Sequence, residues 1–170
     1  GLHTKMLAVA ARTLGVHVSR LRIMPTATDK VPNTSATAAS TGADLNGPAV
    51  KAACETLLAR LRPVAAALLE AAPDEIEFAD DRALVRTDPA RATGFTALLQ
   101  AAYARRVSLS ATGFYATPGL SWDPATSQGH PFHYFAFGAA ACEVEVDGDT
   151  GVHRLLRVDV LHDVGDSLHP

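Results

Sequence analysis

The chain has 170 residues, a formal net charge of −3 at pH 7 and a sequence pI near 6.1. Because 48% of its residues are hydrophobic and 19% are charged, we expect a globular protein with a sizeable core. The weak negative charge gives no reason to expect nucleic acid or a membrane surface as partner, and no apolar run approaches the roughly 18 residues of a membrane span.

The first elements follow from apolar spacing and from residues that end regular structure. Apolar residues at helical spacing predict a first helix at Leu2, Met6, Val9 and Ala10. Gly15 is its expected end, because glycine readily adopts the left-handed conformation of a helix terminus. Leu21 and Ile23 then alternate with arginines, which predicts a half-buried strand ending at Pro25.

Residues 31–47 form a long run of small and hydroxyl-bearing side chains that leads into an amphipathic helix. Such a run lets backbone N–H groups approach a ligand closely, and the helix start behind it suits a phosphate or another anion. Hydroxyl groups are provided by Thr37, Ser40 and Thr41. Room for a bulky ligand is left by Ala38, Ala39 and Gly42. Composition alone favours a capped turn over a binding site here.

The next helix is predicted from an apolar stripe made of Val50, Ala53, Cys54, Leu57, Leu58 and Leu61. Pro48 fits this helix only in its first turn, where the missing N–H is harmless. Pro63 is expected to kink or restart the helix, which then continues through Leu69.

Alternation changes to a strand pattern after this helix. Residues 73–87 predict a hairpin with Asp80 and Asp81 at its turn, and apolar spacing predicts a helix from Phe95 to Ala102. Residues 107–115 and 132–146 predict two further strand regions.

The second of these strand regions is expected to pair with residues 155–161 through a turn at residues 147–151. Strands and helices without βαβ repetition predict an α+β fold of mixed helices and antiparallel strands. The chain has no internal repeat and no clear linker, so we expect one domain or one contiguous piece of a domain.

Several residues invite a chemical interpretation that their context does not favour. His130 and His133 are spaced i, i+3 at a strand entry, where side chains point to opposite faces, so a metal site is disfavoured. Cys54 and Cys142 are interpreted as buried free thiols. For the aromatic side chains, core packing is favoured over a stacking surface for purines: Phe132, Tyr134, Phe135 and Phe137. For the acidic pairs, a solvated surface is favoured over acid–base chemistry: Asp80 with Asp81, and Glu143 with Glu145.

Four strings carry a resemblance to a known family: Gly1-Leu-His-Thr-Lys-Met6; Val31-Pro-Asn-Thr-Ser-Ala-Thr-Ala-Ala-Ser40; Val107-Ser-Leu-Ser-Ala-Thr-Gly-Phe-Tyr115 with Pro131-Phe-His-Tyr-Phe135; and Glu143-Val-Glu-Val-Asp147 with Asp163-Val-Gly165. In order and separation they resemble the molybdopterin-binding subunit of the xanthine dehydrogenases, within the xanthine oxidase/aldehyde oxidase family of molybdenum hydroxylases. The resemblance covers all but about residues 63–91. It implies that residues 1–170 are an internal segment of the molybdopterin-binding domain of a larger enzyme.

The resemblance also implies an activity. Such an enzyme oxidises hypoxanthine or xanthine to urate and passes electrons to NAD, with molybdenum–molybdopterin in this domain and FAD and 2Fe–2S clusters in other parts. It implies a cytoplasmic, oligomeric protein, with the rest of the enzyme or an FAD/iron–sulfur subunit as partner. No membrane or nucleic acid is expected as partner.

The site that the resemblance implies has two parts. Cofactor contacts are expected at Gly1, Thr37, Ala39, Ser40, Thr41 and Gly42, and a wall of the substrate pocket at Ala38 and Ala39. No catalytic residue and no direct metal ligand are expected in this segment, because the family's glutamate base lies far downstream.

Two alternatives stay open. Aldehyde oxidases share much of the pattern, so the substrate is a purine or an aldehyde, although the string at residues 107–115 favours xanthine dehydrogenase. The second alternative is that the chain is a non-catalytic folded fragment that binds no cofactor alone. In isolation, weak or no cofactor binding is expected, because the pterin would be held from one side only.

Overall fold

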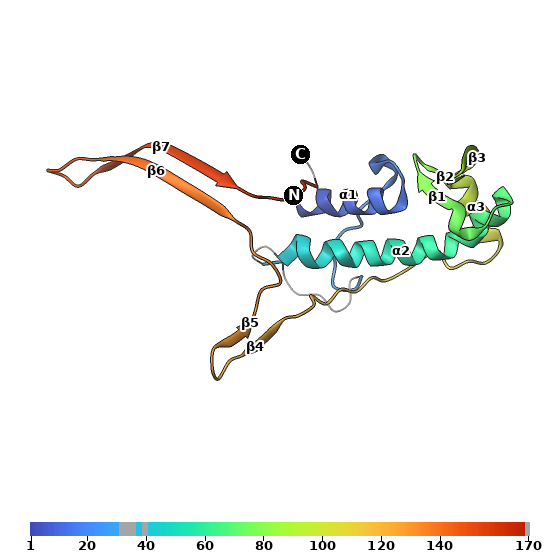
Figure 1. Ribbon diagram of the computed structural model, residues 1–170, viewed down its shortest axis with the longest axis horizontal. Helices are drawn as coiled ribbons and strands as arrows, with labels where there is room; N and C mark the ends of the chain where they lie inside the picture. Colours follow the sequence, from blue (N-terminus) through green and yellow to red (C-terminus); the bar gives the residue numbers. More distant parts are fainter. Residues whose placement is uncertain (31–36, 39–40, 169–170) are drawn as a thin grey trace. The chain divides into compact units, whose positions relative to one another are not determined.

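Figure 1 shows the fold in a computed structural model, which describes residues 1–30, 37–38 and 41–168. The described chain divides into two compact units, residues 1–116 and residues 117–168. Helices and antiparallel sheets occupy separate stretches of the chain, which confirms the predicted α+β class. Within these described ranges, no helix is both long and apolar enough to cross a membrane.

The first helix, α1, spans Leu2–Leu14 and ends where the sequence predicts. Gly15 follows it in the left-handed conformation, with φ 66°, and its N–H donates to the carbonyl of Ala11. A Cβ atom at Gly15 would lie 2.1 Å from the carbonyl oxygen of Phe78. Both the backbone angle and the close approach of the sheet therefore require glycine at this position.

The strand predicted at residues 20–23 is wrong. The chain forms a short 3-10 helix, η1, at Val18–Arg20, and residues 21–25 belong to no strand. The ring of His17 accepts the N–H of Ser19, and the guanidinium of Arg20 pairs with Asp81 at 2.9 Å. These contacts turn the chain locally, and the alternating Leu21 and Ile23 have no neighbouring strand with which to pair.

Helix α2 spans Thr41–Leu69 and begins earlier than predicted. Pro48 therefore lies beyond the first turn, and the prediction that placed it there is wrong. The packing of α2 against α1 outweighs the backbone hydrogen bond that the proline removes. The helix continues past Pro63 to Leu69 as expected. Arg91 caps its end by donating to the carbonyls of Leu69 and Glu70.

A short 3-10 helix, η2 (Pro73–Glu75), leads into a three-stranded antiparallel sheet in the order β1-β2-β3. Strands β1 (Ile76–Ala79) and β2 (Arg82–Val85) form the predicted hairpin, with Asp80 and Asp81 at its turn. These aspartates have φ angles of 51° and 61°, as a two-residue hairpin turn requires. Strand β3 (Asp88–Gly94) was not predicted, because its mostly exposed side chains lack apolar alternation.

The last helix of the first unit, α3, spans Phe95–Ala104 and confirms the predicted helix. It packs with α2 and the sheet around one hydrophobic core. The most deeply buried large side chains of this core are Leu61, Val85, Ile76 and Leu98. Cys54 is also buried, as predicted.

Residues 107–115 form no strand, in contrast to the prediction. The part of this segment from residue 108 to 113, here called the strap, runs along α2. Arg60 donates to the carbonyls of Ser108 and Ser110, at 3.2 and 2.8 Å. At the other end, a Cβ at Gly113 would lie 1.8 Å from the carbonyl oxygen of Ala49. Hydrogen bonds to a side chain and contact with a helix thus replace strand pairing.

The second unit is built from two antiparallel hairpins, which are described separately. The first pairs β4 (Ser121–Asp123) with β5 (Gln128–His130) and was not predicted. The second pairs β6 (Gly138–Val146) with β7 (His153–His162) and confirms the predicted pairing through a turn at residues 147–151. The first part of the predicted strand, residues 132–137, is not in a strand.

Every residue from 118 to 167 is exposed. Cys142 is therefore exposed, and the prediction of a buried thiol is wrong at this position. The prediction of core packing is likewise wrong for four aromatic side chains with exposed fractions of 57–74%: Phe132, Tyr134, Phe135 and Phe137. No described element covers these rings, although two of them, Phe132 and Phe135, lie edge to face at 6.1 Å.

Candidate functional site

The start of α2 and the start of α1 border an open hollow of about 420 Å³ within the first unit. Its lining includes three of the predicted cofactor-binding residues, Gly1, Thr37 and Gly42. The remaining lining residues were not predicted and are Leu2, Lys5, Ala43 and Asp44. The structure therefore brings together segments that are far apart in the sequence, at the place where a ligand was expected.

The beginning of α2 is fixed by Thr41. Its hydroxyl donates to the carbonyl of Ala38 at 2.7 Å, and its backbone N–H approaches the same carbonyl at 3.4 Å. The hydroxyl proton is therefore already engaged. The next N–H groups of the first helical turn have no partner within the helix and lie at its positive end. This end of α2 favours the binding of an anion.

Gly42 is buried at the point where three segments meet. A Cβ atom at this position would lie 2.8 Å from Cγ2 of Thr37 and 3.0 Å from Cδ2 of Leu2. The first distance is shorter than real Cβ contacts and the second is unusually tight, so a larger residue would force the side chains of Thr37 and Leu2 to move. The absence of a side chain at Gly42 keeps the hollow in its shape.

The other predicted site residues have different outcomes. Ala38 is exposed and does not line the hollow, but its carbonyl anchors Thr41. Ala39 and Ser40 lie outside the described residues. The sequence prediction missed Lys5, which lines the hollow. Helical spacing could have indicated it, because Lys5 stands one turn after Gly1 and its backbone N–H donates to the Gly1 carbonyl at 3.3 Å.

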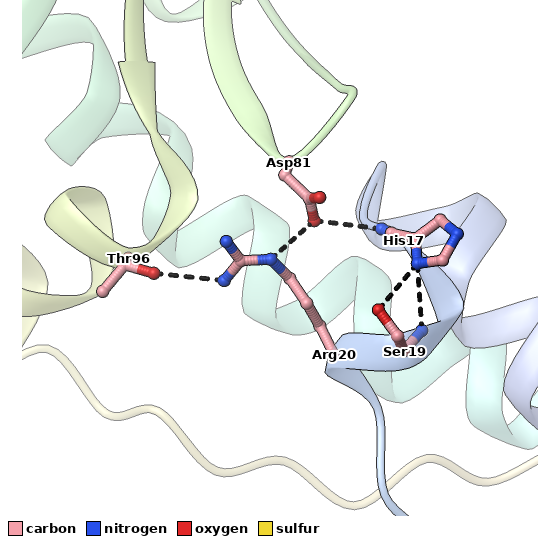
Figure 2. Close-up of polar contacts among 5 residues, drawn as sticks. All are labelled: His17, Ser19, Arg20, Asp81 and Thr96. Carbon is pink, nitrogen blue, oxygen red and sulfur yellow. Dashed lines mark hydrogen bonds and ion pairs between the residues drawn. The ribbon is translucent and has the colours of Figure 1, made fainter.

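A second hollow of about 600 Å³ lies beside the turn between β1 and β2 and contains none of the predicted site residues. Figure 2 shows the polar contacts next to it. Asp81 accepts the backbone N–H of His17 at 3.0 Å and pairs with Arg20, which also donates to Thr96 at 3.1 Å. The interpretation of Asp81 as merely solvated surface is therefore wrong, because its side chain ties the end of α1 to the sheet.

Two alternatives, a metal site and a reactive cysteine thiol, gain no support. No group of three or more His, Cys, Asp and Glu residues is placed to hold a metal ion anywhere in the part of the chain that the structure describes. Burial, with a smaller contribution from the neighbouring Glu55 charge, raises the pKa of the Cys54 thiol. A raised pKa keeps the thiol protonated and unreactive at neutral pH.

Comparison with known proteins connects this geometry with a ligand. The model of the molybdopterin cofactor-binding domain matches residues 1–170. The chain belongs to this family. The hollow at the start of α2 is therefore a candidate part of a molybdopterin site.

Full-length relatives agree with this membership. The chain is 45% identical to the xanthine dehydrogenase/oxidase of Mus musculus over 170 residues and 45% identical to the xanthine dehydrogenase of Dictyostelium discoideum over 173 residues. It is 44% identical to aldehyde oxidase 2 of Cavia porcellus. In each case the match covers 100% of this chain and 11% of the relative, so the chain is a fragment compared with these proteins.

Solved structures show the same fold. A crystal structure of the Cu,Mo-CO dehydrogenase matches 99% of this chain and 20% of its own chain, with a TM-score of 0.78 and 25% identity. Quinoline 2-oxidoreductase from Pseudomonas putida 86 matches 96% of this chain and 20% of its own, with a TM-score of 0.73 and 28% identity. The fold of this chain is therefore similar to that of part of each of these two enzymes.

The residues of the hollow fit the cofactor that the family implies. Gly42 leaves no room for a side chain between Thr37 and Leu2, and the N-terminal turn of α2, whose positive end favours an anion, borders the hollow. Gly1 and Thr37 supply further backbone and hydroxyl groups at the rim. Gly1, Thr37 and Gly42 are not typical metal ligands, so these three suit the organic part of the cofactor, although the lining also contains the carboxylate of Asp44.

Proposed function

We propose that the chain is a segment of the molybdopterin-binding domain of a larger molybdenum hydroxylase that oxidises hypoxanthine or xanthine to urate. The observation that carries the proposal is the meeting of Gly1, Thr37 and Gly42 in one hollow at the start of α2. The match of the molybdopterin cofactor-binding domain over the whole chain supports the choice of ligand.

In this proposal the chain binds and orients the cofactor. Backbone N–H groups after Thr41 hold anionic atoms, and Gly42 lets α1 and the residues before α2 close around the ligand. Ala38 and Ala39 form a wall of the substrate pocket, and Ala39 and Ser40 contact the cofactor. When bound, the molybdenum cofactor supplies the redox chemistry, while the protein contributes position and exclusion of water.

The remaining steps belong to other parts of the proposed enzyme. FAD and 2Fe–2S clusters carry the electrons to NAD, and the residue that removes a proton from the substrate is supplied from outside residues 1–170. We place the intact protein in the cytoplasm as an oligomer, in contact with an FAD/iron–sulfur subunit or domain.

An aldehyde oxidase-type reaction is the second candidate. The identity of 44% with aldehyde oxidase 2 of Cavia porcellus, against 45% with the mouse xanthine dehydrogenase/oxidase, supports it almost equally. Turnover of the full-length protein separates the two candidates. We expect NAD reduction with hypoxanthine and xanthine and urate as product; oxidation of aldehydes without urate formation would favour the second candidate.

The pocket wall is tested by an Ala39→Phe substitution in the full-length protein. A ring at this position would displace the cofactor or block the substrate, so turnover should fall by a factor of about 100 or more, as misplacement of reacting groups commonly causes. Ala67→Phe is the matched control, because Ala67 is exposed on α2 far from the hollow. Full turnover and full molybdenum content in Ala39→Phe would exclude the assigned role.

A further inference from the structure

The hairpin of β6 and β7 carries only apolar side chains on one face along most of its length. In an antiparallel pair, residues that lie opposite each other share a face, and every second row belongs to the same face. Three such rows are apolar in both strands: Ala140 with Val160, Cys142 with Val158, and Val144 with Leu155. Val146 continues the row toward the turn. These seven residues are here called the apolar hairpin face.

The opposite face of the same hairpin is charged. Its rows place Glu143 opposite Arg157 and Glu145 opposite Arg154. Arg154 pairs with Glu145 at 2.5 Å, and Arg157 pairs with Asp159 at 2.7 Å. Charged side chains of this kind stay in water, so this face is the solvent side of the hairpin. The apolar hairpin face is therefore the side that the sequence suits for burial.

The residues that the structure describes leave the apolar hairpin face exposed. Val144, Leu155 and Val160 have exposed fractions of 52%, 56% and 70%. A two-stranded hairpin is at best marginally stable in water, so one with nine register pairs needs an apolar neighbour. Contiguous apolar surface of this kind marks a contact with another protein segment.

The size of the face distinguishes a segment of the same chain from a second molecule. From Ala140 to Val146 a strand advances about 23 Å, and two strands are about 10 Å wide, which gives an area of roughly 230 Å². Stable association of separate proteins buries about 800 Å² on each partner. The face is thus too small to hold a second copy by itself. A segment of the same chain needs less area, because no free molecule loses its translational and rotational freedom.

The relatives show how much further chain such a protein has. Residues 1–170 correspond to 11% of the mouse xanthine dehydrogenase/oxidase and to 20% of the CO dehydrogenase chain with the similar fold. We propose that the apolar hairpin face docks onto an apolar segment of the same polypeptide, outside residues 1–170. The proposal rests only on that part of the proposed function that makes this chain a segment of a larger protein, and it is independent of the cofactor.

The first test measures the protection of a thiol in the full-length protein. Cys142 lies in the middle row of the apolar hairpin face, whereas the neighbouring Ala141 lies in a row of the charged face. Alkylation by N-ethylmaleimide is followed by mass spectrometry for wild-type Cys142 and for Ala141→Cys in a Cys142→Ser background. Each rate is compared with the rate at the same position after unfolding in urea. Cys54, which is buried in the first unit, gives the rate of a covered thiol.

We expect Cys142 to react at least about 100-fold more slowly than in the unfolded protein, because reaction at a covered face requires local opening. Ala141→Cys should react within about tenfold of its unfolded rate. A Cys142 that reacts like an unfolded thiol would overturn the proposal, and so would equal protection at the two positions. Cys142 is measured without any substitution, so this result does not depend on the folding of a variant.

A second measurement identifies the segment that covers the face. A diazirine-bearing amino acid replaces Leu155 in the full-length protein, and the irradiated products are separated by mass before peptide mapping. We expect a product with the mass of one chain, cross-linked to an apolar segment outside residues 1–170. A product of doubled mass, or a cross-link to another subunit or within residues 1–170, would contradict the proposal. The same amino acid at Arg154, on the charged face, is the control and should react mainly with water.

The pterin content of the same preparation separates this proposal from the proposed function. A protein without pterin whose Cys142 is protected would refute the cofactor assignment and support the docking face. A loaded protein whose Cys142 reacts freely would refute the docking face alone.

Discussion

The two units of the chain differ in how their apolar residues are used. All buried hydrophobic side chains of the described residues belong to residues 1–116, where three helices and a sheet enclose them. Residues 118–167 are exposed throughout, although they include many valines, leucines and aromatic residues. Apolar residues therefore form a packed core in the first unit and stay exposed in the hairpins of the second.

The hairpin of β6 and β7 illustrates this difference. Its register places Cys142, Val144 and Val146 on one face, while Glu143 lies opposite Arg157 and Glu145 opposite Arg154 on the other. The strand is thus amphipathic, as a half-buried strand is, yet both of its faces are exposed within the described chain. An amphipathic pattern reports which face can be buried, whereas burial depends on what packs against it.

The largest predicted effect concerns the two units expressed separately. Residues 1–116 should fold cooperatively, whereas residues 117–168 should be largely unfolded, because isolated two-stranded hairpins are at best marginally stable in water. Far-UV circular dichroism and urea titration of the two fragments measure this. A cooperative transition in residues 117–168, or none in residues 1–116, would break the comparison.

Two leucines of α2 test the core within the fragment of residues 1–116. Leu61 is 2% exposed and Leu68 is 41% exposed on the same helix. Leu61→Ala should lower the free energy of unfolding by about 2–5 kcal/mol through lost burial and a cavity. Leu68→Ala should lower it by less than about 1 kcal/mol. Similar losses in urea titrations of the two variants would contradict the position of the core.

Gly113 tests the contact of the strap with α2. At about 1.5 Å per residue, α2 advances about 16 Å from Ala49 to Arg60. Extended chain from Ser108 to Gly113 covers about the same length, which is consistent with contact at both ends. Gly113→Ala would place Cβ against the Ala49 carbonyl and should cost about 1–3 kcal/mol of unfolding free energy.

The matched control for this substitution is Gly94→Ala. A Cβ at Gly94 meets no atom within 4 Å, and the residue has an ordinary φ of −65°. Urea titration of both variants in the fragment of residues 1–116 should therefore show a loss for Gly113→Ala only. Equal stability of the two would mean that the strap is not held against the helix.

The turn between β1 and β2 gives a smaller effect. Asp80 and Asp81 share a positive φ, so alanine strains both positions similarly, but Asp81 alone has the contacts with His17 and Arg20. We expect Asp81→Ala to cost about 1 kcal/mol more unfolding free energy than Asp80→Ala, a modest value because the carboxylate is partly exposed. Thermal melts of both variants in residues 1–116 measure the difference, and equal melting temperatures would contradict the tie.

The smallest effect is expected in the second unit. Hydrogen bonds from the backbone and side chain of Thr150, and from the backbone of Asp149, lower the pKa of Asp147 below its ordinary 3.8. A lowered pKa in the folded turn means that its stabilising effect exists above the ordinary value and is lost as pH falls through the lower value. Carboxyl NMR titration of the full-length protein should place the midpoint of Asp147 below 3.8. A midpoint at or above that value would contradict the turn.

The ends of helices and the turns of hairpins were the predictable part of the fold. Gly15 ends α1, and the two aspartates turn the hairpin, because these residues act through their own backbone angles. Tertiary contacts decide the rest, and sequence patterns do not contain them. Strand β3 has no apolar alternation, α2 passes Pro48 because α1 packs on it, and residues 107–115 look like a strand yet contact a helix.

The candidate site was predicted in the same uneven way. The small residues before α2 were found from composition and from the resemblance of four strings, and Gly42 lies in the hollow as expected. Lys5 was missed although helical spacing places it one turn after Gly1, because a lysine on an exposed helix does not by itself show what it lines. Its place in the hollow depends on where the start of α1 meets the start of α2.

The most direct test of the account is the molybdenum and pterin content of the full-length wild-type protein and of its Gly42→Leu variant. We expect about one molybdenum and one pterin per wild-type subunit, and a strong loss of both in the variant, because the leucine would fill the hollow between Leu2 and Thr37. A wild-type protein that folds in cells making the cofactor but contains neither, or a fully loaded variant, would contradict the account.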